Sequence, residues 1–153
     1  MRTFSSIADL TAAVGEIIGP GPWFRVEQDR VDAFAEATGD HQWIHTDPER
    51  AAAGPYGGTV AHGYLTLSLL PVLVRDLYRV ANVRMVINYG LNRVRFPAPL
   101  HTGDAVRATA EIRQVDPVDG GVQLVARVTV EPERGGKPCC VAETVTRIYA
   151  AGG

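Results

Sequence analysis

Apolar and polar residues alternate one by one along much of the second half of the chain. Residues 106–113 and 122–131 follow this period of two, which puts the apolar side chains of a β-strand on one face. Residues 83–96 and 139–149 are rich in β-branched and aromatic residues and predict two further strands. Glycine, proline and aspartate between these segments predict turns, so we expect antiparallel strands joined by hairpins.

Apolar residues at helical spacing mark two shorter segments in the first half. Residues 6–14 begin with Ser6, whose hydroxyl is suited to cap a helix N-terminus. Residues 27–37 carry a second helical pattern, and Gly39 is a natural helix stop. A Gly-Pro-Gly-Pro sequence separates the two, and residues 23–26 after it predict a short strand.

A longer and more apolar helix is predicted over residues 62–80. Leu65, Leu69 and Leu73 recur at spacings of four, and most other positions are apolar as well. Such a helix should be buried nearly all round. Pro71 lies within it and predicts a kink or the loss of one hydrogen bond.

The order of these elements indicates an α+β fold. Helices come first, one of them is long and apolar, and several antiparallel strands follow, so we expect a sheet wrapped around one buried helix. The length of 153 residues is typical of one domain, and we treat residues 1–153 as a single domain.

Composition narrows the class of protein further. The chain is 46% hydrophobic with a formal net charge of −2, which argues against a disordered chain and against a nucleic-acid binder. Cys139 and Cys140 are adjacent, so we predict two reduced thiols rather than a disulfide. Neither a signal peptide nor an apolar run of about 20 residues is evident, and we expect a soluble, cytoplasmic protein.

Reactive side chains are densest in residues 38–48, within a stretch of irregular structure that we expect over residues 39–61 with a short helix after Pro48. Three of the four histidines lie between positions 41 and 62. Asp40 and His45, held over one pocket, can bind a water, deprotonate it and return the proton. A structural explanation stays open here: Asp40 as a cap, and His45 as a hydrogen-bonded loop residue.

Two further segments carry candidate binding groups. Gly63 stands at the predicted helix start, where its N–H can polarise a carbonyl, although His62 or Gly63 can equally be a simple cap. Arg93 and Arg95 point the same way on a predicted strand and can meet phosphates, although a solvated strand face is the commoner reason for such a pair.

A family resemblance rests on the motif Gly39-Asp40-x-x-x-Ile44-His45-x-Asp47-Pro48-x-x-Ala51, followed by Ala61-His62-Gly63. This pattern resembles the hydratase motif of the MaoC-like dehydratases, which include the (R)-specific enoyl-CoA hydratases. Arg95-Phe96-Pro97-Ala98-Pro99 is similar to the family's strand after the helix. The chain departs from the family where Gln42-Trp43 replaces a frequent Asn-Pro, a change that bears on loop packing or substrate preference.

The resemblance implies a hot dog fold, a homodimer joined through sheet edges, and an active site near the interface. It implies reversible syn hydration of a trans-2-enoyl-CoA to an (R)-3-hydroxyacyl-CoA, with acyl-CoA or an acyl-carrier thioester as substrate. No metal or redox cofactor is expected. The expected catalytic residues are Asp40, His45 and Gly63, and the expected substrate-binding residues are His62, Tyr64, Asn88, Asn92 and Arg95. For Asn88 and Asn92 the alternative stays open that they only satisfy buried backbone groups.

Three alternatives stay open from the sequence. A thioesterase fits the same fold, because fold alone does not fix function. A non-catalytic acyl-thioester binding module would bind ligand without turnover. A metal hydrolase has suitable residue types but no established ligand spacing in its four candidate ligands, Asp40, His41, His45 and His62.

Overall fold

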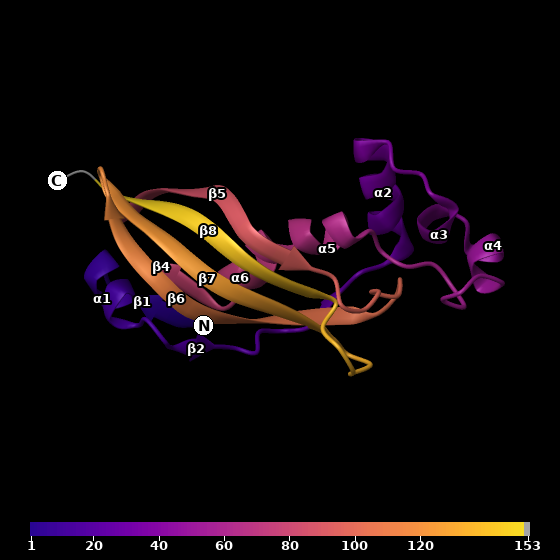
Figure 1. Ribbon diagram of the computed structural model, residues 1–153, viewed down its shortest axis with the longest axis horizontal. Helices are drawn as coiled ribbons and strands as arrows, with labels where there is room; N and C mark the ends of the chain where they lie inside the picture. The colour runs from indigo at the N-terminus through magenta and orange to yellow at the C-terminus, as the bar shows by residue number, and fades with distance from the viewer. Residues whose placement is uncertain (152–153) are drawn as a thin grey trace.

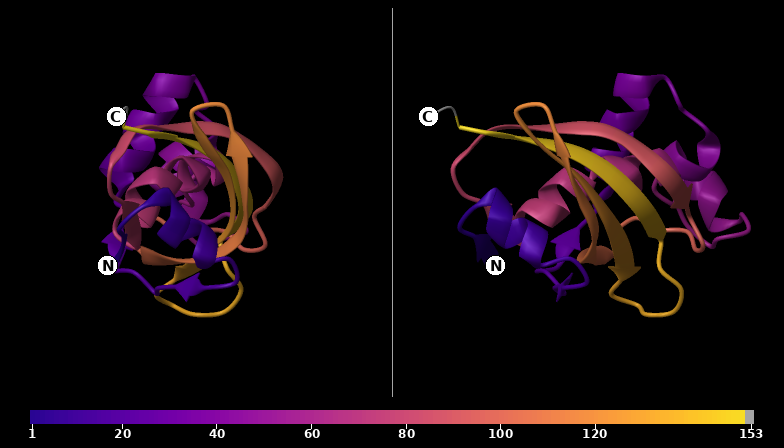
Figure 2. Two further views of the ribbon diagram at one scale, coloured as in Figure 1. Left: turned by 90° about the vertical axis from the view of Figure 1, so that its left-hand side faces the viewer. Right: turned by 60° about the vertical axis from the view of Figure 1, so that its left-hand side comes forward.

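Four long antiparallel strands form the body of the molecule in the computed structural model, which describes residues 1–151. They curve around two short helices, as the end-on view shows (Figure 1, Figure 2). The strand order is β2-β6-β7-β8-β5, and β3 also pairs with β6. The strands of this sheet are β2 (Ile17–Ile18), β3 (Phe24–Arg25), β5 (Val83–Arg95), β6 (Ala105–Val118), β7 (Gly121–Pro132) and β8 (Cys140–Ala150).

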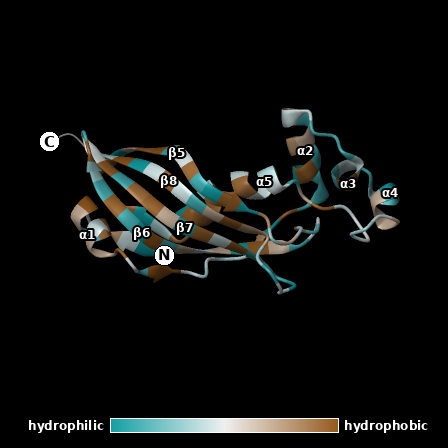
Figure 3. Cartoon of the chain, in the orientation of Figure 1, coloured by the Kyte–Doolittle hydropathy of each residue, from teal (hydrophilic) through white to brown (hydrophobic). Residues whose placement is uncertain are grey.

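The alternation in the sequence sets which face of this sheet is buried. Bands of opposite hydropathy follow one another along the strands (Figure 3). In register across three strands, Ala110, Val128 and Ala142 all turn inward and are buried. The predicted strands are therefore confirmed, and so are the hairpins β6–β7 and β7–β8. The hairpin expected between β5 and the next strand is wrong, because β5 pairs with β8 and not with β6. β6 runs further than expected, because Val118 pairs directly with Gly121 and leaves only a two-residue turn.

The long helix predicted over residues 62–80 is wrong in its extent. Two helices replace it, α5 (Gly63–Ser68) and α6 (Leu70–Arg75), with Leu69 between them. Pro71 falls in the first turn of α6, the position where its missing N–H costs nothing. Leu65, Leu69 and Leu73 are buried against the sheet, as their spacing predicted. The expectation of burial nearly all round is wrong, because Tyr64, Ser68 and Pro71 are exposed.

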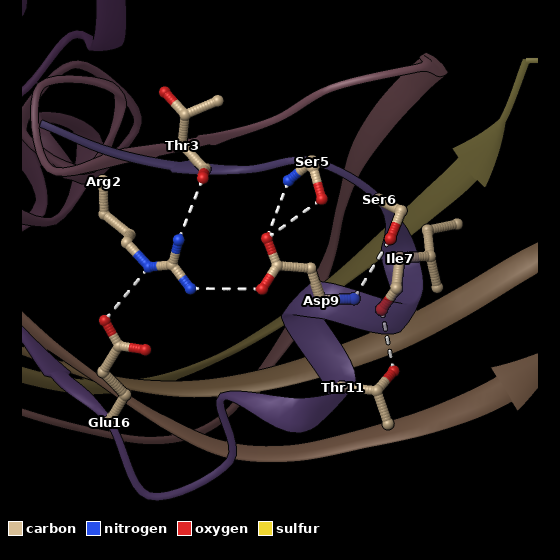
Figure 4. Close-up of polar contacts among 8 residues, drawn as sticks. All are labelled: Arg2, Thr3, Ser5, Ser6, Ile7, Asp9, Thr11 and Glu16. Carbon is tan, nitrogen blue, oxygen red and sulfur yellow. Dashed lines mark hydrogen bonds and ion pairs between the residues drawn. The ribbon is translucent and has the colours of Figure 1, made fainter.

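Residues 78–80, which we expected to be helical, form strand β4 (Tyr78–Val80). They pair in parallel with β1 (Arg2–Phe4). Next to β1, helix α1 (Ile7–Ala12) begins where the Ser6 hydroxyl accepts a hydrogen bond from the Asp9 N–H, as the sequence predicted. Arg2 joins these pieces, because its guanidinium contacts Asp9 at 3.2 Å and Glu16 at 3.3 Å (Figure 4).

Cys139 immediately precedes β8, Cys140 is its first residue, and both carry free thiols. Cys139 donates through its sulfur to the Val130 carbonyl, and both residues are buried. Burial raises the pKa of Cys139 to about 12 and that of Cys140 to about 11, so both are protonated at neutral pH.

Across residues 1–151 we find no helix with the length and hydropathy needed to cross a bilayer. The cytoplasmic location expected above stays a prediction from the sequence.

Candidate active site

Asp40 follows directly on helix α2 (Gln28–Thr38). Gly39 ends that helix with φ of +79°, a left-handed conformation that glycine adopts without strain. The predicted helix stop is thus confirmed, and it turns the chain sharply before the carboxylate. Asp40 is exposed, and one of its carboxylate oxygens accepts a hydrogen bond from the Gln42 N–H at 3.4 Å.

His45 lies in helix α3 (Trp43–Thr46), one turn that the sequence did not predict. The side chain is 7% exposed, and its Nδ1 lies 2.6 Å from the Val60 carbonyl oxygen. A carbonyl oxygen only accepts, so Nδ1 carries the proton and Nε2 keeps a free lone pair. Helix α4 (Pro48–Ala52) follows, capped by Asp47, and confirms the short helix expected after Pro48.

The unusual Gln42-Trp43 pair has a packing role in this turn. The Trp43 ring holds the Arg50 guanidinium at 4.4 Å from its centroid. It also fills the space beside Gly54, where an added Cβ would meet the ring at 2.9 Å. Trp43 therefore packs α3 against α4.

The structure brings Asp40, His45 and His62 together. One carboxylate oxygen and one nitrogen from each imidazole all lie within 4.8 Å of one another. A water that bonds both groups at about 2.8 Å keeps its two partners within about 5.6 Å. The spacing of Asp40 and His45 therefore suits one water held between them.

This cluster stands next to the start of α5. His62 is the N-cap residue, and its ring stacks on His45 with centroids 3.8 Å apart. Gly63 is the first helical residue, so its N–H has no acceptor within the helix. Phe96 packs against it so closely that a Cβ on Gly63 would lie 3.0 Å from the ring.

Electrostatics keep the His45 imidazole neutral near neutral pH. Burial lowers its pKa, and the neighbouring His62 lowers it further. The Val60 carbonyl and the Asp40 carboxylate act in the opposite direction, but the net direction is downward. His45 is accordingly available as a proton acceptor at ordinary pH.

The same three side chains could be ligands of a metal ion, and their geometry argues against it. The rings of His45 and His62 lie only 25° from parallel, one above the other. Their lone pairs run in nearly parallel planes, so an ion bonded to both would lie out of the plane of at least one ring in this arrangement. His41, the fourth candidate ligand, instead lies 3.5 Å from Glu36.

The remaining predicted substrate residues lie outside this cluster. Tyr64 is 71% exposed beside Phe96. Asn88 and Asn92 lie on the exposed strand β5, where Asn92 donates to Glu143 at 2.8 Å. Arg95 is exposed on the same strand and bonds the Val94 carbonyl. Within residues 1–151, none of them hydrogen-bonds Asp40 or His45.

Sequence reasoning missed two residues that hold the cluster in place. Gln28, the first residue of α2, donates to the His45 carbonyl at 2.7 Å and accepts from the Thr59 hydroxyl at 2.6 Å. Phe34, also on α2, packs on His62 with ring centroids 4.9 Å apart. Both contacts join segments far apart in sequence, so no local sequence pattern could predict them.

Comparison with known proteins places the chain in a family. A family model described as a MaoC like domain matches residues 9–133. The chain belongs to the MaoC-like dehydratase family. It is therefore a hydro-lyase, and the curved sheet around α5 and α6 is the hot dog fold, as the resemblance implied.

Individual relatives agree with this family membership. The chain is 55% identical over 151 residues to 3-hydroxyacyl-thioester dehydratase Z of Mycobacterium tuberculosis, covering 98% of this chain and 100% of the relative. It is 42% identical to Nodulation protein N of Rhizobium leguminosarum bv. viciae, covering 94% and 91%. A solved (R)-hydratase from A. caviae involved in PHA biosynthesis matches with a TM-score of 0.70 and 25% identity, covering 87% and 94%.

Proposed function

We propose that this MaoC-like dehydratase catalyses the reversible syn addition of water to a trans-2-enoyl thioester, giving an (R)-3-hydroxyacyl thioester. The observation that carries the proposal is the Asp40 and His45 pair, spaced for one water beside the first amide of α5. The names of its relatives, a 3-hydroxyacyl-thioester dehydratase and an (R)-hydratase, support the substrate class and the hand of the product.

The water is activated by the pair. In the hydration direction, the water oxygen forms a bond to C3 of the enoyl group while its proton passes to the pair. The Nε2 lone pair of His45 is free to accept, and the Asp40 carboxylate holds the second water hydrogen. The same pair then returns one proton to C2, so one water is added and no other group is released.

The Gly63 N–H is the third group in the mechanism, and it stabilises the charge on the thioester oxygen. As the C3–O bond forms, the electron pair of the alkene moves toward the thioester oxygen and gives an enolate. A backbone donor already in place stabilises that charge, and loss of one such donor typically costs about 10²–10³ in rate. In this scheme the thioester is substrate and no metal or redox cofactor is required.

The test is hydration of crotonyl-CoA, followed by loss of enoyl absorbance. Asp40→Asn and His45→Gln should each lower kcat by about 10²–10⁴, because each removes acid–base help while conserving size. His41→Gln is the matched control: an exposed histidine one residue from Asp40 that lies outside the cluster. Full activity of either cluster variant would overturn the assignment.

A thioesterase is distinguished in the same assay. A thiol reagent would report free CoA released from a saturated acyl-CoA, whereas a dehydratase releases none. Binding of crotonyl-CoA without change in absorbance or thiol would indicate a non-catalytic binding module.

The exposed strand β5 supports a homodimer. It is the last strand of the sheet, and several of its apolar side chains are exposed, including Val86 at 57%, Tyr89 at 57% and Leu91 at 45%. An open edge of this kind needs a partner, and a second copy offers the same edge. Light scattering should give twice the chain mass, and Val86→Glu should give the monomer.

A basic groove supports phosphate binding near Arg95. Arg93, Arg95, Arg113 and Arg127 line a depression of about 320 Å³ across the outer side of the sheet, and Glu143 is the one carboxylate among its lining residues. Arginine suits phosphate because its fork of N–H groups bonds two oxygens at once. We assign this groove to the phosphates of the acyl carrier, so Arg95→Ala should raise KM for crotonyl-CoA with little change in kcat.

A further inference from the structure

His62 is the buried residue against which the reactive pair rests. Its side chain is 2% exposed, although Asp40 beside it is open to solvent. One face of its ring is covered by His45, and Phe34 packs on it at 4.9 Å between ring centroids. A ring enclosed in this way contacts its neighbours rather than a substrate.

The same ring also holds the backbone of the acid. His62 Nε2 lies 2.9 Å from the main-chain carbonyl oxygen of Asp40, 22 residues earlier in the chain. Because a carbonyl only accepts, the hydrogen bond requires the proton on Nε2. Nδ1 then carries the lone pair, and it is buried without a hydrogen-bond partner in the described chain.

An unpartnered buried nitrogen is costly, so its presence calls for an explanation. The explanation here is geometric. Only an aromatic ring with an N–H at one corner can stack on His45 and reach the Asp40 carbonyl at the same time, and histidine leaves its second nitrogen idle in doing so.

We propose that His62 is a positioning residue for the Asp40 and His45 pair: its ring face fixes the His45 imidazole, and its Nε2–H fixes the backbone of Asp40. This inference rests on the proposed function, since it assigns the pair to one water. The sequence suggested that His62 contacts the substrate. We assign it instead to holding the two residues that do.

Two substitutions separate the two contacts. His62→Phe keeps an aromatic ring against His45 and Phe34 but removes the donor to Asp40. His62→Gln keeps a side-chain N–H donor but removes the ring. Misplacement of a reacting group by about 1 Å can cost about 10²-fold in rate, so each variant should lower kcat by about 10–100-fold. KM should change by less than about twofold, because His62 does not face the substrate.

The pH profile gives a readout that a purely structural role would not move. Asp40 and His62 are the titratable groups that act on His45, His62 lowering its pKa and Asp40 raising it. Removing His62 lets the pKa of His45 rise, so the acid limb of kcat/KM should shift to higher pH in both variants.

A control separates loss of stability from loss of positioning. Val31→Ala removes two buried methyl groups from α2, the same helix that carries Phe34, without touching the cluster. It should lower stability and leave kcat and the acid limb unchanged. Unchanged kcat and an unchanged acid limb in folded His62→Phe and His62→Gln would overturn the inference.

Nitrogen NMR of the imidazoles in the wild-type protein tests the arrangement without any assay. The expected tautomers are Nδ1–H for His45 and Nε2–H for His62, and the reverse tautomer at His62 would overturn the inference even if no variant folds. A wild-type protein with these tautomers but no hydratase activity would instead remove the proposed function and leave the buried scaffold intact.

Discussion

Opposite ends of the curved sheet hold their polar side chains by different means (Figure 1). At the N-terminal end, the Arg2 guanidinium is satisfied by two carboxylates, Asp9 and Glu16, all of them partly exposed. At the other end, His45 and His62 are buried, and each bonds a main-chain carbonyl.

The difference teaches how a reactive group stays available. Paired charges such as Arg2 and Asp9 satisfy one another, and neither retains a free group for chemistry. A histidine held through one nitrogen by a carbonyl oxygen is fixed in orientation and tautomer while its second nitrogen stays open. The histidine end should therefore govern activity, and the arginine end should govern only stability.

Apart from the Asp40 and His45 pair itself, the largest effect is expected at Gly63, where an added side chain has too little space. Gly63→Ala puts a Cβ 3.0 Å from the Phe96 ring and displaces either the ring or the amide, so kcat should fall by up to about 10²-fold. Crotonyl-CoA hydration measures it. Gly58→Ala, where an added Cβ meets nothing within 4 Å, is the control. Wild-type kcat in Gly63→Ala would contradict the role of this amide.

Gln28 should affect both activity and stability, because its hydrogen bonds support the histidine end of the molecule. Gln28→Leu leaves the His45 carbonyl and the Thr59 hydroxyl without their partner, at a cost of about 1–3 kcal/mol for each group that stays dry. Urea unfolding should show this loss, and kcat should fall about tenfold as His45 moves. The same change at exposed Gln114 should alter stability by less than about 0.5 kcal/mol.

The pH dependence of stability should also separate the two ends. The pKa of His45 is lowered on folding, so between its ordinary value of 6.5 and the lower native value the unfolded chain binds a proton that the native protein does not. The free energy of unfolding should therefore be full above pH 6.5 and decline as pH falls through that window. Chemical denaturation of His45→Gln should show a flatter profile, whereas exposed His41→Gln should retain the wild-type decline.

The smallest effect is expected at Arg2. Its ion pairs are partly exposed, and such pairs contribute little, so Arg2→Ala should lower Tm by about 2–4 °C. The difference should shrink in 1 M salt, where surface charges are screened. Hydration activity should stay at the wild-type level, and a large loss would show that the two ends are coupled.

Local patterns predicted the elements that local contacts decide. Ser6 caps α1, Gly39 ends α2, and the alternation in β6 and β7 selects the buried face. Each of these depends on neighbours within a few residues or on burial of a repeated face.

Contacts between distant segments were beyond such patterns. Residues 78–80 have helical spacing, yet pairing with residues 2–4 makes them a strand. The motif around Asp40 and His45 marked both as candidate reactive groups, which stays a prediction, but it did not indicate that His62 stacks on His45, since the stack joins residues 17 apart in sequence. The carbonyl of Val60, which sets the tautomer of His45, carries no side-chain signal at all.

The adjacent cysteines at the start of β8 give the molecule a built-in reporter of sheet opening. Alkylating reagents attack the thiolate, and both thiols here are buried and protonated, Cys139 with its sulfur directed to the Val130 carbonyl. Separation of β7 and β8 would expose them, because Cys140 pairs with Val130 across this hairpin, so the speed of labelling should report its opening. The rate of this opening can therefore be measured on the native chain, with no engineered tag or dye.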